Sequence, residues 1–196
     1  MTIRCFLAFS LNGQFQERLK HTLDELRQTN ADVKWVKLDN IHLTLKFLGE
    51  LEVIHINNIK SRLKERCSGL SPITSYLNGI GAFPDLSHPK IVWAALDDSK
   101  NEIRKLVEIL KEELIIFGVV REDHPFKPHI TLGRVRTSVN LKDLIQTIEK
   151  ITIEEHIQQT FDKIILYKSQ LTSQGPIYEV LQEFYLGRKE LEVDRF

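Results

Sequence analysis

The sequence has little of several residue types, and each shortage excludes a class of protein. Its two cysteines, Cys5 and Cys67, are too few and too isolated for a disulfide framework or a cysteine-based zinc site. With 6 prolines and 9 glycines in 196 residues, and no Pro/Ser-rich linker or low-complexity tract, nothing in the composition divides the chain. We therefore expect residues 1–196 to form a single domain.

An excess of either charge is also missing, since 27 Lys and Arg residues balance 27 Asp and Glu residues. This balance excludes the broad basic surface of a protein that grips long nucleic acid, but it allows a small anionic ligand or the end of an RNA. The apolar segment 114–120 is far shorter than a membrane span, and the N-terminal apolar stretch is too short for a signal sequence. These features predict a cytoplasmic protein with reduced cysteines and no membrane partner.

What the sequence does contain is a duplicated motif. The pattern His-x-Thr-Leu occurs at His42 in "IHLTLKFLGE" and at His129 in "PHITLGR", which are 129 − 42 = 87 residues apart. One copy would carry little information, but apolar spacing typical of helices and strands repeats around both copies in the order β-α-β-β-α-β. Helices are expected at 15–26, 56–67, 103–114 and 141–148, and strands at 3–11, within 33–49, and at 75–83, 90–96 and 161–169. The duplication predicts two similar lobes that face each other.

The motif itself indicates a catalytic site. Side chains alternate along a strand, so His42 and Thr44 project together, as do His129 and Thr131, while the apolar residues between them face the core. Two histidines on opposite sides of a phosphate could remove a proton from the nucleophile and give one to the leaving oxygen. Hydroxyl groups between them could donate hydrogen bonds to phosphate oxygens. This combination favours phosphodiester chemistry without a metal or cofactor, although the motifs could instead be incidental polar faces of half-exposed strands.

Three segments carry a family resemblance: "NIHLTLKFLGE" at 40–50, "FKPHITLGR" at 126–134 and "LYKSQLTSQGPIYEVL" at 166–181. They resemble the 2H phosphoesterase superfamily, and most closely its RNA 2′,3′-cyclic phosphodiesterases, also called 2′-5′ RNA ligases. The resemblance implies an α+β fold of two intertwined lobes, with antiparallel sheets flanking a central cleft and helices outside. It also implies an enzyme that hydrolyses a 2′,3′-cyclic phosphate at an RNA end to a 2′-phosphate, and that can run the reverse 2′-5′ ligation without ATP. Separately, we expect the protein to be a monomer.

By the same resemblance, each motif residue has an implied role. His42 is the proton donor to the departing 3′ oxygen and His129 the proton acceptor from water, an assignment that the symmetry of the motifs alone leaves open. Thr44 and Thr131 hold the phosphate oxygens, and Arg134 adds a cation beside the phosphate.

Other residues near the motifs are weaker candidates for contact with substrate. Lys46 is expected on the same strand face as His42 and Thr44, and Phe9 and Phe126 could stack on a base, with core packing as the alternative for both. Further basic residues beside the motif strands could line the mouth of the cleft, or could be ordinary surface: Lys37, Lys127, Arg136 and Lys168. The remaining histidines match no zinc-binding spacing, so no metal ligand is predicted.

Two alternative functions stay open at this point. An enzyme of the same superfamily could act on another cyclic-phosphate nucleotide or on a 2′-5′ oligoadenylate. A non-catalytic module could bind RNA ends without turnover, although binding alone does not require two titrating histidines.

Overall fold

The computed structural model of the chain describes residues 2–120, 124–153, 157–173 and 175–187. Its helices are α1 (Gly13–Arg27), the short 3-10 helix η1 (Leu38–Asn40), α2 (Val53–Ser68), α3 (Glu102–Ile115) and α4 (Leu141–Lys150). Its strands are β1 (Thr2–Ser10), β2 (Val33–Trp35), β3 (His42–Glu52), β4 (Ile73–Phe83), β5 (Ile91–Leu96), β6 (His129–Val135), β7 (Gln158–Phe161), β8 (Lys163–Thr172) and β9 (Gly175–Tyr185). The predicted α+β class is confirmed.

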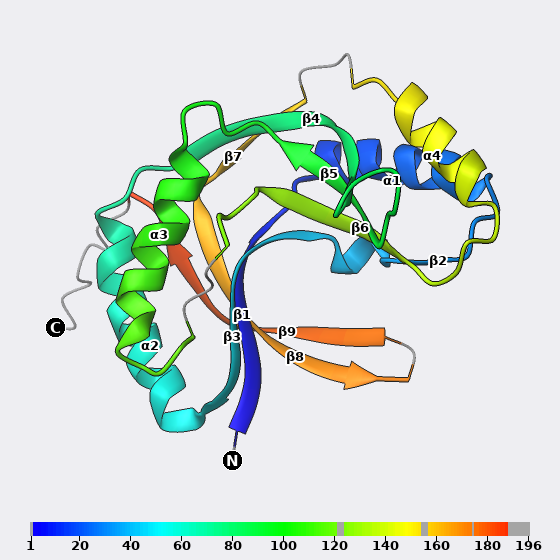
Figure 1. Ribbon diagram of the computed structural model, residues 1–196. Helices are drawn as coiled ribbons and strands as arrows, with labels where there is room; N and C mark the ends of the chain where they lie inside the picture. Colours follow the sequence, from blue (N-terminus) through cyan, green and yellow to red (C-terminus); the bar gives the residue numbers. More distant parts are fainter. Residues whose placement is uncertain (1, 121–123, 154–156, 174, 188–196) are drawn as a thin grey trace, which may run out of the picture.

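The strands form one curled antiparallel sheet whose order is symmetric about its middle (Figure 1). The order is β7-β4-β5-β6-β3-β1-β8-β9, with β2 added beside β6. The two halves join where Leu43 of β3 pairs with Ile130 of β6. These residues are 130 − 43 = 87 positions apart, which is the period of the sequence repeat. The pseudo-symmetry axis therefore passes through the pair that separates the His and Thr of each motif.

The helices pack in two pairs, and each pair combines one helix from each half of the repeat. Although α1 follows β1, it lies beside α4 of the second half, while α2 lies beside α3 on the opposite flank (Figure 1). Each helix buries one apolar stripe, as its sequence spacing predicts; in α1 this stripe is Phe15, Leu19, Leu23 and Leu26. Asn12 begins α1 by accepting the Phe15 N–H through its side-chain oxygen, at 2.9 Å.

Each motif strand contains an extra residue at the same place in the repeat, and β3 has a second one farther along the strand. In β3 the residue is Leu45, because Ala8 pairs with Thr44 while Leu7 pairs with Lys46. In β6 the residue is Leu132, again 132 − 45 = 87 positions later. A bulge of this kind breaks the alternation of faces, so residues beyond it point to the opposite side from the one that simple parity predicts.

Candidate active site

The register at the centre of the sheet brings the two motifs together on one face. Because Leu43 pairs with Ile130 in an antiparallel ladder, the neighbouring positions place His42 opposite Thr131 and Thr44 opposite His129. The two histidines thus lie diagonally across the junction, with the threonine hydroxyls between them. The geometry matches the arrangement that the duplicated motif predicts.

Both imidazoles are held in the same orientation by the backbone. His42 Nδ1 lies 2.8 Å from the carbonyl oxygen of Asn40, and His129 Nδ1 lies 2.7 Å from that of Lys127. A carbonyl oxygen only accepts hydrogen bonds, so each Nδ1 carries the proton and each Nε2 of a neutral ring is left as an acceptor. The Thr44 hydroxyl lies 2.9 Å from His42 Nε2 and donates to it in this state. Each Nε2 is therefore the atom that can take up or release a proton at the site.

Burial favours the neutral form of both rings. Burial lowers the pKa of His42 below its ordinary value, and the bond to the Asn40 carbonyl opposes this effect. The pKa of His129 is also lowered, first by burial and then by the positive charge of Arg134, against the bond to the Lys127 carbonyl. An anion beside either ring would favour its protonated form.

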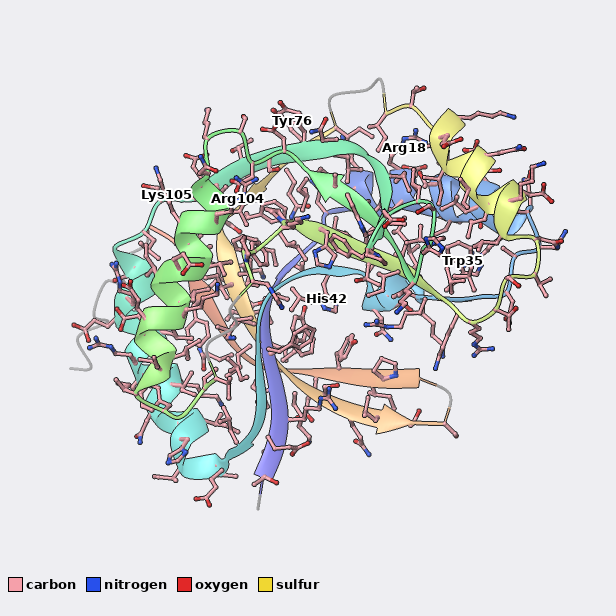
Figure 2. The ribbon with its side chains drawn as sticks, in the orientation of Figure 1. Arg18, Trp35, His42, Tyr76, Arg104 and Lys105 are labelled. Carbon is pink, nitrogen blue, oxygen red and sulfur yellow. The ribbon has the colours of Figure 1, made fainter. Side chains whose placement is uncertain are left out.

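A cavity of about 380 Å³ opens on the His42 side of the junction. Its walls come from β1, β2, η1, the centre of the sheet and the β8–β9 hairpin: Arg4, Cys5, Phe6, Lys34, Trp35, Val36, Lys37, Asn40, His42, Thr44, Phe47, Thr131, Arg134, Ser169, Leu171, Gly175, Pro176 and Tyr178. Figure 2 shows His42 near the middle of the molecule, with Trp35 of β2 to its right. Among these lining residues four are Arg or Lys and none is Asp or Glu, so the cavity is positive although the chain is neutral overall.

His129 is not among the residues that line this cavity. It lies beyond Thr44 on the other side of the junction, where the Phe83 ring stands perpendicular to it at 4.9 Å. His42 has its own aromatic neighbours, Phe6 at 4.9 Å and Tyr178 at 5.3 Å. The two histidines are therefore equivalent in orientation but not in surroundings.

The bulges explain which residues reach the cavity after each motif. Arg134 follows the bulge at Leu132 and lines the cavity, as the resemblance implies. The equivalent position in the first half, 134 − 87 = 47, is Phe47, which also lines the cavity and is 56% exposed. One half thus supplies a guanidinium and the other an aromatic ring at the same place.

Two predicted substrate contacts need correction. Lys46 was expected on the face of His42, but the bulge at Leu45 turns it inward; it is 3% exposed, and its Nζ donates to the Val120 carbonyl at 2.8 Å. Phe9 is 0% exposed and stacks on Phe161 with ring centroids 4.5 Å apart, so it offers no surface to a base.

Phe126 is partly buried against the core and is not among the cavity-lining residues. Of the basic residues considered, Lys37 lines the cavity, whereas Lys168 forms a 2.8 Å ion pair with Glu179.

Several residues that line the cavity are not predicted from the sequence: Arg4, Phe6, Lys34, Trp35 and Tyr178. For Arg4 and Phe6 a signal existed, because alternation along the first strand puts them on the face opposite Cys5 and Leu7. For Tyr178 there was none, since its position depends on the register of the β8–β9 hairpin. Among the side chains that the structure describes, no group of three or more His, Cys, Asp or Glu is placed to hold a metal ion. Within the same residues, none of the helices is long and apolar enough to cross a membrane.

Comparison with known proteins agrees with this geometry. A sequence model described as LigT-like phosphoesterase matches residues 9–93 and 95–178, so that each matched range contains one His-x-Thr motif. The chain belongs to the LigT-like phosphoesterase family. Two relatives, from Aquifex aeolicus and Archaeoglobus fulgidus, are named RNA 2′,3′-cyclic phosphodiesterase. The first is 31% identical and the alignment covers 94% of this chain and 98% of the relative; for the second the values are 33%, 93% and 99%.

Solved structures show the same LigT-like fold. A crystal structure of a Thermus thermophilus protein superposes with a TM-score of 0.77 and 25% identity, covering 94% of this chain and 98% of that one. Escherichia coli LigT in its apo form gives a TM-score of 0.75 at 22% identity, covering 95% and 99%.

Proposed function

We propose that the chain is an RNA 2′,3′-cyclic phosphodiesterase that opens the cyclic phosphate at an RNA end to a 2′-phosphate. The observation that carries the proposal is the matched pair of imidazoles, His42 and His129, each with Nδ1 fixed by a backbone carbonyl and Nε2 available for proton transfer. The relatives named as RNA 2′,3′-cyclic phosphodiesterases support the choice of substrate. A binding module would have no use for two proton-transferring groups.

The position of the cavity supports different roles for the two histidines. The nucleoside that carries the cyclic phosphate needs space, and the cavity that supplies it is lined by His42 and not by His129. The ribose 3′ oxygen therefore faces His42, and water attacks from the opposite side, beside His129. We therefore assign His42 as the general acid and His129 as the general base.

The reaction follows from that placement. His129 Nε2 takes a proton from water as the water oxygen bonds to phosphorus, and the bond from phosphorus to O3′ breaks. O3′ leaves with the proton from His42 Nε2, giving a 2′-phosphate and a 3′-hydroxyl. The anionic phosphate stabilises protonated His42 in the complex, which offsets the effect of burial on its pKa. No step in this scheme requires a metal ion.

Thr44, Thr131 and Arg134 bind the phosphate in this scheme. Thr44 and Thr131 lie between the histidines and can donate to the phosphate oxygens once His42 is protonated and no longer accepts the Thr44 proton. Arg134 lines the same cavity and places a fixed positive charge beside the charge that develops on phosphorus.

Three further properties belong to the proposal. The reverse reaction, attack of a 5′-hydroxyl in place of water, would join RNA ends as a 2′-5′ linkage without ATP. One chain carries both histidines, so a monomer suffices for activity. Because α1 of the first half packs against α4 of the second half, we expect the two halves to unfold together. This predicts a single calorimetric unfolding transition.

The test uses purified protein, EDTA and a short RNA ending in a 2′,3′-cyclic phosphate, followed by separation of the cyclic, 2′-phosphate and 3′-phosphate ends. Formation of the 2′-phosphate in the presence of EDTA would support the proposal. Turnover only of cyclic mononucleotides or of 2′-5′ oligoadenylate would favour another superfamily substrate. Binding of the RNA without turnover would favour a non-catalytic module, and a 3′-phosphate product would contradict the assigned leaving group.

A further inference from the structure

A second cation of the cavity wall is Arg4, which is opposite Glu50 of β3, a residue that does not line the cavity. Arg4 and Phe6 are two residues apart on β1 and both line the cavity. In the pairing of β1 with β8, Cys5 is opposite Lys168, which puts Arg4 beside Ser169. Ser169 in turn pairs with Tyr178 of β9. Arg4, Ser169 and Tyr178 therefore stand next to one another on three adjacent strands, on the face that lines the cavity.

Tyr178 connects this position to the catalytic centre. Its ring stands edge-on to the His42 ring, with the ring centroids 5.3 Å apart. The positive charges of Arg4 and Arg134 both act on its hydroxyl group. Burial raises the pKa of the Tyr178 hydroxyl, with the two guanidinium groups opposing the rise, so the group remains a hydrogen-bond donor at neutral pH.

The backbone positions of Arg4 and the catalytic centre are farther apart than consecutive phosphates of RNA, so the Arg4 side chain has to shorten the gap. Ala8 pairs with Thr44, and Arg4 precedes Ala8 by four residues, which is about 13 Å along a strand. The long Arg4 side chain can bridge part of that distance. The Phe6 and Tyr178 rings lie between Arg4 and the catalytic centre, with their centroids 4.9 Å apart. They offer aromatic surface to the sugar and base of the terminal nucleotide.

We propose that Arg4 and the Tyr178 hydroxyl bind the phosphodiester group on the 5′ side of the terminal nucleotide, so that the enzyme selects RNA ends over cyclic mononucleotides. This inference rests on the proposed function, since it assumes that the cyclic phosphate lies between His42 and His129. Lys34 and Lys37, on the β2 and η1 wall of the cavity, add positive charge that attracts the phosphates of the preceding nucleotides.

The test compares two substrates, a 2′,3′-cyclic mononucleotide and the dinucleotide that ends in the same cyclic nucleotide. The wild-type protein should have the higher kcat/KM for the dinucleotide. Arg4→Gln should reduce this preference about tenfold, the effect of losing one charge-assisted phosphate contact, and Tyr178→Phe should reduce it less. Lys20→Gln removes an equal charge from an exposed position of α1, away from the cavity, and should keep the preference.

The salt dependence of kcat/KM is a second test, because a purely structural role of Arg4 would not change it. A further phosphate contact should steepen the fall of log kcat/KM with log salt concentration by about 0.7 for the dinucleotide relative to the mononucleotide. Arg4→Gln should abolish that difference, and its remaining activity on the mononucleotide reports that the variant is folded.

The two ideas fail in different ways. If the wild-type protein hydrolyses neither substrate, the proposed function is wrong and the inference falls with it. If it hydrolyses both with equal kcat/KM and equal salt slopes, or if Arg4→Gln keeps the preference for the dinucleotide, the proposed function stands and the Arg4 site is wrong.

Discussion

Asn40 links the wall of the cavity to the catalytic acid, and replacing it tests whether that link matters. Its side-chain Nδ2 donates to the Pro176 carbonyl at the tip of the β8–β9 hairpin, at 2.9 Å, while its own carbonyl accepts from His42 Nδ1 at 2.8 Å. A shift of Asn40 therefore moves both the hairpin and the imidazole. The equivalent position in the second half is 40 + 87 = 127, a lysine whose carbonyl holds His129.

Asn40→Ala removes the hydrogen bond from the side chain to the Pro176 carbonyl and keeps the backbone carbonyl that accepts from His42 Nδ1. The lost hydrogen bond should cost about 0.5–1.5 kcal/mol of unfolding free energy, which lowers Tm by about 2–4 °C per kcal/mol in a protein of this size. If the same free energy is lost in positioning His42, kcat falls by up to about tenfold. A weaker bond from the carbonyl also lowers the pKa of His42 further, so the alkaline limb of the pH profile should move to lower pH.

The assay is kcat and kcat/KM against pH on the cyclic-phosphate RNA, with Tm measured in parallel. Asn57→Ala is the matched control, because Asn57 is an exposed asparagine of α2 that does not line the cavity, and its replacement should leave kcat and the pH profile unchanged. A lower Tm with unchanged kcat and an unmoved alkaline limb would refute the reasoning and reduce Asn40 to a structural role.

Three further predictions follow from the same geometry. Gly133→Ala would place a Cβ 2.6 Å from both Trp35 Cε3 and Val33 Cγ1, so it should lower the free energy of unfolding by about 1–3 kcal/mol and lower Tm. Gly13→Ala is the control and should not lower Tm, because a Cβ there meets nothing within 4 Å. Equal Tm values for the two variants would contradict the tight β2–β6 contact. Arg134→Ala should lower kcat/KM about 10- to 100-fold, with Arg134→Lys in between, and equal activity of all three forms would exclude a contact between Arg134 and phosphate. Burial lowers the pKa of both histidines, so the bell-shaped pH profile of kcat/KM should be centred below about pH 6.5. The pH profile of kcat should be centred at a higher pH, because bound phosphate favours the protonated rings. A kcat/KM profile centred above about pH 6.5 would contradict the burial argument.

The sequence predicted the duplication and the facing motifs because both depend on local patterns. His42 with Thr44 and His129 with Thr131 share a face through simple alternation, and their meeting follows from the 87-residue period. The family resemblance placed Arg134 beside them, where the structure also finds it.

Simple alternation failed beyond the motifs for a physical reason. One extra residue at Leu45 reverses the faces of the residues that follow, which buries Lys46 and exposes Phe47 to the cavity. Nothing in the composition of the strand marks this bulge. The contribution of Tyr178 was equally hidden, because it depends on how a hairpin more than 130 residues after the first motif folds over the cavity.

The central claim is that two histidines act from opposite sides, with His42 as acid and His129 as base. The most direct measurement uses a cyclic substrate in which sulfur replaces the bridging 3′ oxygen, since a thiolate leaves without needing a proton. On the normal substrate, His42→Ala and His129→Ala should each lose about 10²- to 10⁴-fold in kcat. On the sulfur substrate, activity should return in His42→Ala and stay lost in His129→Ala. Recovery in His129→Ala instead would reverse the roles, and full activity of either variant on the normal substrate would contradict the two-histidine mechanism.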